Sequence, residues 1–108
     1  MADGPTIDIK PLHLRIVLDV LNRRVPQYPV WAFGSRARCK AKPYSDLDLA
    51  IIAEKPLPMA TRAALAEDFS ESDLPWRVDV VDWSTTSESF RTIIERDKVI
   101  LTTGVAEA

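Results

Sequence analysis

The apolar run from Leu47 to Ala53 is interrupted by one charged residue, Asp48. The run is far shorter than the roughly 20 residues that a membrane-spanning helix requires. Its aliphatic residues instead predict a strand that is buried on at least one face. Because a buried strand needs neighbours, the run indicates a sheet that other elements cover.

Those other elements are indicated by the spacing of apolar residues and by the positions of prolines. Helices are expected over residues 11–24, from Met59 to about Phe69, and from about Thr85 to Arg96. Strands are expected at 30–33, 47–53, 76–83 and 99–102. This order of elements predicts an α/β or α+β domain with a small mixed sheet flanked by helices.

Two local patterns describe the later helices. One is an apolar stripe at helical spacing, typical of an amphipathic helix, formed by Met59, Ala63, Ala66 and Phe69. The other is the capping-box spacing of Thr85 and Glu88, so the last helix is expected to begin there.

The composition limits the class of protein. A chain of 108 residues, 46% apolar and 28% charged, is typical of a globular protein, and we expect one domain over residues 1–108. The first ten residues lack the apolar region of a secretory signal, so a cytoplasmic location without membrane contact is expected. A net charge of −2 argues against direct nucleic-acid binding. The local basic segment 23–42 can meet phosphates or an acidic partner, or can be a solvated loop.

Asp46 and Asp48 open the apolar strand expected at 47–53, and alternate side chains of a strand share a face. Adjacent carboxylates repel each other unless a cation lies between them or one of them binds a proton. Mg²⁺ suits such a pair, because it takes one or two protein carboxylates and completes its shell with water and phosphates. If the strand of Asp79 lies alongside, the carboxylates can hold two metal ions about 4 Å apart. Asp79, enclosed by valines, is expected on the core side of the sheet, with Asp82 on the opposite face.

Gly34 and Ser35 follow the preceding strand. Glycine lets the backbone approach a phosphate closely, and the serine hydroxyl and the backbone N–H groups of a turn can bind phosphate oxygens. Arg36 and Arg38 are expected to add positive charge there. An Asp-x-Asp sequence alone is a weak signal. The ordered combination with Gly-Ser and a later strand aspartate is more specific.

That combination resembles the signature of the minimal nucleotidyltransferases, small members of the DNA polymerase β-like superfamily. Gly34-Ser35, ten intervening residues, Asp46-Leu47-Asp48 and Val78-Asp79-Val80 match it in order. The resemblance implies transfer of AMP from ATP to an acceptor hydroxyl, with release of pyrophosphate. It also implies that Asp46 and Asp48 hold two Mg²⁺ ions, that Asp79 completes one of these sites, and that Gly34 and Ser35 grip the β and γ phosphates.

Stand-alone members of this size often act as antitoxins of HEPN-domain toxins. The resemblance therefore implies a protein adenylyltransferase that modifies a hydroxyl, expected to be a tyrosine, of a HEPN ribonuclease toxin. Two alternatives stay open: an antitoxin that acts by binding alone, and a nucleotidyltransferase for a small-molecule or nucleic-acid acceptor. The enzyme ranks first because the carboxylates and the Gly-Ser are all present. One position departs from the family, since many relatives have glycine where this chain has Cys39, and cysteine is strained at a positive φ.

Overall fold

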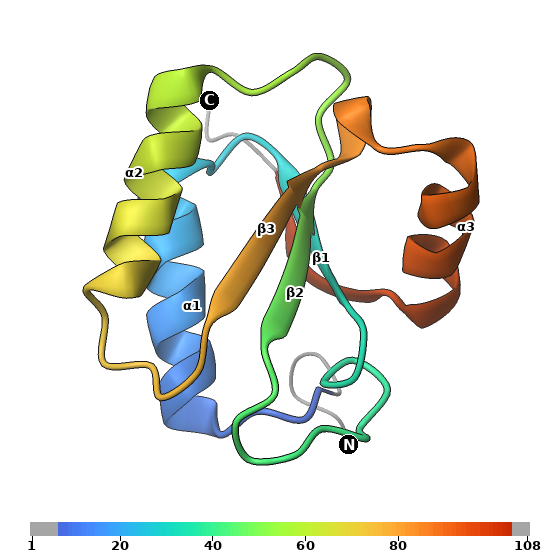
Figure 1. Ribbon diagram of the computed structural model, residues 1–108. Coiled ribbons are helices and arrows are strands. Elements are labelled where there is room, and N and C mark those ends of the chain that lie inside the picture. The colour runs from blue at the N-terminus through green and yellow to red at the C-terminus, as the bar shows by residue number, and fades with distance from the viewer. Residues whose placement is uncertain (1–6, 105–108) are drawn as a thin grey trace.

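The computed structural model describes residues 7–104. Its helices and strands, drawn in Figure 1, are α1 (Pro11–Arg24), β1 (Pro29–Phe33), β2 (Leu47–Ile51), α2 (Met59–Ser70), β3 (Val78–Asp82), a short 3-10 helix (Trp83–Thr85), α3 (Glu88–Asp97) and β4 (Val99–Thr103). The predicted order of elements is confirmed. No helix in this part of the chain has both the length and the apolar character needed to cross a membrane.

The strands form one sheet in the order β3-β2-β1-β4. β2 and β3 run parallel, whereas β1 is antiparallel to both β2 and β4. The sheet is therefore mixed, as predicted, and the α+β class is confirmed. β2 lies inside the sheet, and β3 forms one of its edges in the described part of the chain.

Helices cover both faces of this sheet, with α1 and α2 on one side and α3 on the other (Figure 1). The larger core lies under α1 and α2 and includes Leu47 and Leu49 of β2. A smaller cluster, with Ala50 of β2 and Ile94 of α3, lies on the opposite face. Because strand side chains alternate, Asp48 shares the α3 side of the sheet with Ala50.

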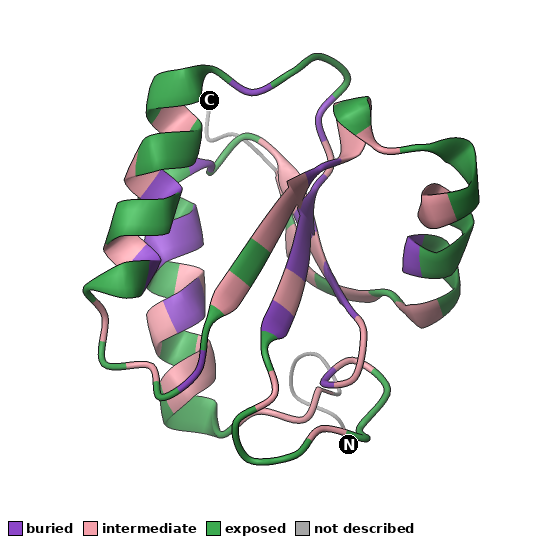
Figure 2. Ribbon diagram, in the orientation of Figure 1, coloured by how far each residue is buried: buried purple, intermediate pink, exposed green. Residues whose placement is uncertain are grey.

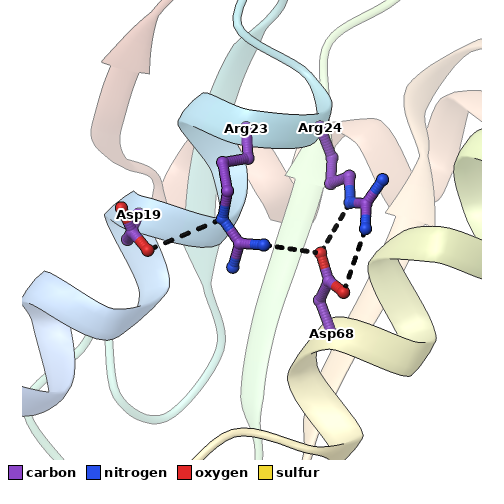
Figure 3. Close-up of polar contacts among 4 residues, drawn as sticks. All are labelled: Asp19, Arg23, Arg24 and Asp68. Atoms are coloured by element: carbon purple, nitrogen blue, oxygen red, sulfur yellow. Dashed lines mark hydrogen bonds and ion pairs between the residues drawn. The ribbon is translucent and has the colours of Figure 1, made fainter.

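Ion pairs join α1 and α2, the two helices that cover the larger core (Figure 3). Arg24 of α1 donates to Asp68 of α2 at 2.6 Å, and Arg23 lies 3.5 Å from the same carboxylate. The hydrogen bond from Arg24 lowers the pKa of Asp68. Two bases of the predicted basic segment therefore face α2.

The predicted apolar stripe of α2 is only partly buried. Leu65 and Phe69 are in the core. Met59 is 85% exposed, and Ala63 and Ala66 are also exposed. Most of the predicted stripe thus lies outside the core.

The prediction that Asp79 lies on the core side of the sheet was wrong. β3 is half-buried or exposed up to its last residue, unlike the largely buried β2 (Figure 2), and Asp79 is exposed. The valines on either side of it, Val78 and Val80, pack against the larger core. Alternation then turns Asp79 to the α3 side.

Asp82 is the buried acid of this strand, 5% exposed. Its carboxylate accepts hydrogen bonds from the Leu57 N–H at 2.8 Å and from the N–H and hydroxyl of Ser84 at 2.9 and 2.7 Å. Burial alone would raise its pKa, but these bonds hold the pKa of Asp82 below its ordinary range. Asp82 therefore fixes the end of β3 to the segment before α2.

The start of α3 also differs from the expected capping box. The N-cap is Ser87, whose hydroxyl accepts from the Phe90 N–H at 3.2 Å. Thr85 belongs to the preceding 3-10 helix, and its hydroxyl donates to the Asp82 carbonyl. The helix begins at Glu88 because serine supplies the better-placed cap.

Candidate functional site

Asp48 of β2 and Asp79 of β3 are register partners in the parallel pair. Both side chains lie on the α3 side of the sheet, because Leu47 and Leu49 occupy the other face of β2 and Val80 the other face of β3. The structure thus places the second aspartate of the Asp-x-Asp motif beside the third predicted aspartate.

The electrostatics of this pair are unfavourable. Burial, and then the negative charges of Asp79 and Asp46, raise the pKa of Asp48 to about 6. Within residues 7–104, none of the ion pairs involves Asp46, Asp48 or Asp79. Among the described residues, these carboxylates therefore form no ion pair that would offset their mutual repulsion.

The number of carboxylates that converge decides how a metal ion can bind here. Asp46 lies just before β2 and is exposed. No group of three or more His, Cys, Asp or Glu side chains positioned to hold a metal occurs between residues 7 and 104. Mg²⁺ does not need such a group, because it takes one or two carboxylates and fills its shell with water and phosphate oxygens. Carboxylate oxygens that make no ion pair within the described residues, beside the predicted phosphate turn, fit Mg²⁺ in that mode.

Gly34, directly after β1, touches the same carboxylate. Its φ is +82°, in the left-handed region that favours glycine. A Cβ built at Gly34 would collide with Oδ2 of Asp48 and lie 3.3 Å from Cγ of that residue. The predicted phosphate turn and the predicted metal ligand are therefore in contact.

The turn that follows is tightly wound. The Arg38 N–H donates to the Gly34 carbonyl at 3.0 Å, and the Lys40 N–H donates to the Ser35 carbonyl at 2.9 Å. Cys39, inside this turn, has a φ of 57°. The position where many relatives have glycine is thus left-handed here, and cysteine adopts that conformation.

Arg36 has a different environment from the one expected of a phosphate ligand. Its side chain is buried, and its Nε donates to the Ser45 carbonyl at 2.9 Å. Other guanidinium nitrogens donate to the carbonyls of Asp8, Pro43 and, at 3.4 Å, Lys42. These bonds clamp the loop between Gly34 and Asp46, and they do not fit the predicted phosphate contact.

Two residues that the sequence pattern did not single out complete this clamp. The Asp8 N–H donates to the Arg36 carbonyl at 2.8 Å, and its carboxylate accepts from the Ala41 N–H at 3.3 Å. The Trp76 ring lies 4.5 Å below the Arg36 guanidinium, in a cation–π contact. No sequence spacing links these residues, because they come from three distant segments.

Arg38 is exposed beside the turn. Asp97, at the end of α3, lies near Arg38 and Gly34. The sequence pattern did not identify this residue either. A hydrogen bond from Arg96, with smaller contributions from Arg38 and the Gly34 N–H, holds the pKa of Asp97 below its ordinary range despite burial. The phosphate turn is thus flanked by one arginine and one acid.

Comparisons with known proteins agree with this geometry. Residues 19–104 match the family described as polymerase beta, nucleotidyltransferase. A Haemophilus influenzae protein described as a probable protein adenylyltransferase, MntA, is 60% identical over 101 residues, which cover 94% of this chain and 89% of that protein.

Solved structures share the fold. A toxin–antitoxin structure with AMP-PNP aligns with a TM-score of 0.71 at 24% identity, over 83% of this chain and 73% of the matched one. A structure of a tri-AMPylated Shewanella oneidensis HEPN toxin in complex with MNT antitoxin gives 0.67 at 23% identity, over 88% and 73% of the two chains. At these identities the likeness establishes the fold.

Proposed function

Because the chain belongs to the polymerase beta nucleotidyltransferase family, we propose that it transfers AMP from ATP to a hydroxyl of a HEPN-type toxin and thereby acts as its antitoxin. The proposal of a protein acceptor is supported by the 60% identity to a probable protein adenylyltransferase. The expected cytoplasmic location is part of the same proposal.

One observation carries the catalytic part of this proposal. Asp48 lies in register with Asp79 and also lies against Gly34. Consecutive positions across β1, β2 and β3 therefore offer a turn for phosphates, a metal ligand and a candidate base. In-line transfer needs these groups in that order.

The residues have distinct roles in the proposed reaction. The turn at Gly34, with the Ser35 hydroxyl and the exposed Arg38, holds the β and γ phosphates, where charge develops on the leaving pyrophosphate. The acceptor oxygen attacks the α phosphorus, a new P–O bond forms, and the bond to the bridging oxygen of pyrophosphate breaks. The hydroxyl proton passes to the Asp79 carboxylate. Arg36 keeps the loop between the two halves of the motif in place.

The carboxylates of Asp46, Asp48 and Asp79 would hold Mg²⁺, with two ions expected. When bound, Mg²⁺ neutralises the phosphates and lowers the pKa of the acceptor hydroxyl. The packing of Asp48 against Gly34 orients its carboxylate toward the phosphate turn.

The test combines the purified chain with its cognate HEPN toxin, ATP and MgCl₂, and measures the intact mass of the toxin. We expect one or more AMP adducts. The double variant Asp46→Ala/Asp48→Ala should give none, and omission of Mg²⁺ should have the same effect. Adduct formation by the double variant at the wild-type rate would refute the metal-dependent mechanism.

A growth assay separates catalysis from binding. If the double variant still rescues cells from the toxin although it forms no adduct, the chain neutralises by binding. If only the wild type rescues, AMP transfer is the neutralising event.

A further inference from the structure

A cavity of about 730 Å³ lies between α2 and β3. Its lining includes Met59, Arg62 and Ala63 of α2, and Val78, Asp79 and Val80 of β3. This volume is within the range of about 300–1,000 Å³ found for ligand pockets. Asp79 belongs to the lining at the β3 edge, although its carboxylate turns to the α3 side with Asp48, so the cavity and the carboxylates lie on opposite faces of one edge strand.

The α2 wall is the apolar stripe that the sequence indicated by its helical spacing. Met59, Ala63 and Ala66 follow helical spacing, yet all are exposed and all line the cavity. The core beneath α2 is filled by Leu65 and Phe69. These apolar residues are therefore not needed to fill the core. An exposed apolar helix face beside a cavity is typical of a surface that a partner covers.

The β3 wall is an open sheet edge in the described part of the chain. The Leu47 N–H donates to the Arg77 carbonyl, and Leu47 pairs with Val78. In a parallel ladder with this register, the backbone of Asp79 bonds to β2, whereas the backbone groups of Val78 and Val80 point away from it. An extended peptide can bond to such an edge as an added strand.

The order of the site across the sheet fixes the side from which the acceptor arrives. The phosphate turn follows β1, Asp48 lies in β2 and Asp79 in the edge strand β3. In-line displacement places the leaving pyrophosphate and the attacking oxygen on opposite sides of the α phosphorus. With pyrophosphate at the β1 end, the hydroxyl comes from the β3 side.

We propose that an extended segment of the acceptor protein lies along β3 as an added strand and fills this cavity, here called the α2–β3 groove. The segment carries the hydroxyl to be modified and places an apolar side chain against Met59 and Ala63. The occupant is an extended peptide because the groove combines an apolar wall with unpaired backbone groups, and because alternate side chains of an added strand would face the groove and the Asp79 carboxylate in turn. This inference rests on the proposed AMP transfer to a protein.

Matched substitutions on α2 test it. Ala63→Gln places a long polar side chain in the groove, whereas Ala60→Gln makes the same change at another exposed position of the helix outside the lining. Because both variants replace alanine with glutamine, the change in helix propensity is the same in each. For Ala63→Gln we expect KM for the HEPN toxin to rise by roughly 5-fold or more, the cost of losing a central contact. KM for ATP should not change, and Ala60→Gln should resemble the wild type.

Hydrogen exchange gives a second readout. The amides of Val78 and Val80 should become protected when toxin is added, and should be exposed in the free chain at every protein concentration. Equal KM values for the two variants, or no added protection, would overturn the groove assignment while AMP transfer itself persists. Protection that rises with the concentration of the free chain would assign the groove to a second copy instead. Absence of AMP transfer by the wild type would reject the proposed function and this inference together.

Discussion

The carboxylate of Asp48 occupies the space into which a side chain at Gly34 would project. Gly34→Ala should therefore displace Asp48 and also force alanine to a φ of +82°. We expect a loss of about 1–3 kcal/mol in the free energy of unfolding, the usual cost of such a backbone position. AMP transfer should fall by roughly 100-fold, because a misplaced ligand spoils the reacting geometry. Urea unfolding and toxin mass measure the two effects.

Gly104→Ala is the control for backbone strain alone. Gly104 also has a positive φ, and a Cβ there would collide with the backbone of Tyr28 and Pro29, away from the carboxylates. This variant should lose stability while its folded fraction keeps the wild-type rate of AMP transfer. Equal losses of AMP transfer in both variants would argue against a special role for Gly34.

Arg36→Lys tests the loop clamp. Lysine keeps the charge but cannot donate to the Ser45, Pro43 and Asp8 carbonyls at once. We expect stability to fall by about 2 kcal/mol, since several part-buried carbonyls lose a charged donor at once. KM for ATP should rise more than kcat falls, because the phosphate turn is displaced.

Arg38→Lys is the comparison for Arg36. Arg38 is exposed, so its substitution should change stability by less than about 0.5 kcal/mol and act on ATP affinity alone. If Arg36→Lys were as stable as Arg38→Lys in thermal unfolding, the clamp would have no stabilising role.

Cys39 supports a prediction about backbone strain. Its φ of 57° costs a non-glycine residue about 1–2 kcal/mol, whereas glycine costs about 0.5–1 kcal/mol in chain entropy. Cys39→Gly should therefore leave stability unchanged or raise it by up to about 1 kcal/mol. Cys39→Val should lower it, because a branched side chain tolerates this region poorly. Calorimetry that ranks valine above glycine would exclude a left-handed residue 39.

The buried Asp82 should make stability depend on pH. Its pKa in the folded chain lies below the ordinary range because Leu57 and Ser84 donate to the carboxylate. The unfolded chain then binds more protons in acid, so this contribution is complete above the unfolded pKa and is lost as pH falls from about 5 through the folded pKa. The stability difference between wild type and Asp82→Asn should shrink across that range in urea titrations. A difference that stays constant with pH would mean that the carboxylate charge is not stabilising.

Local patterns were sufficient for the elements and for the order of Gly34, Asp48 and Asp79. Helical and strand periodicity depend on near neighbours, and the family signature fixed the spacing of the motif. The side of β3 that faces the core could not be predicted from the local sequence. It depends on α1 and α2 covering one face, which turns Val78 and Val80 inward and Asp79 outward.

Arg36 shows the second limit of sequence reasoning. An arginine after Gly-Ser suits a phosphate, and only the fold shows that its donors reach Asp8, Pro43 and Ser45. The stripe of α2 shows a third limit, because helical spacing identifies an apolar face but not whether the core or a partner covers it.

AMP transfer to the HEPN toxin by Asp48→Asn, compared with Asp73→Asn, is the most direct measurement of the proposed catalytic site. Asparagine preserves the shape of Asp48 against Gly34 but removes the charge proposed to bind Mg²⁺, whereas Asp73 is exposed before β3. Under single-turnover conditions with ATP and Mg²⁺, the Asp73→Asn chain should modify the toxin at the wild-type rate. The Asp48→Asn chain should leave the toxin mass unchanged while its circular dichroism spectrum matches the wild type. Equal modification by both variants would show that Asp48 is not part of the reacting site.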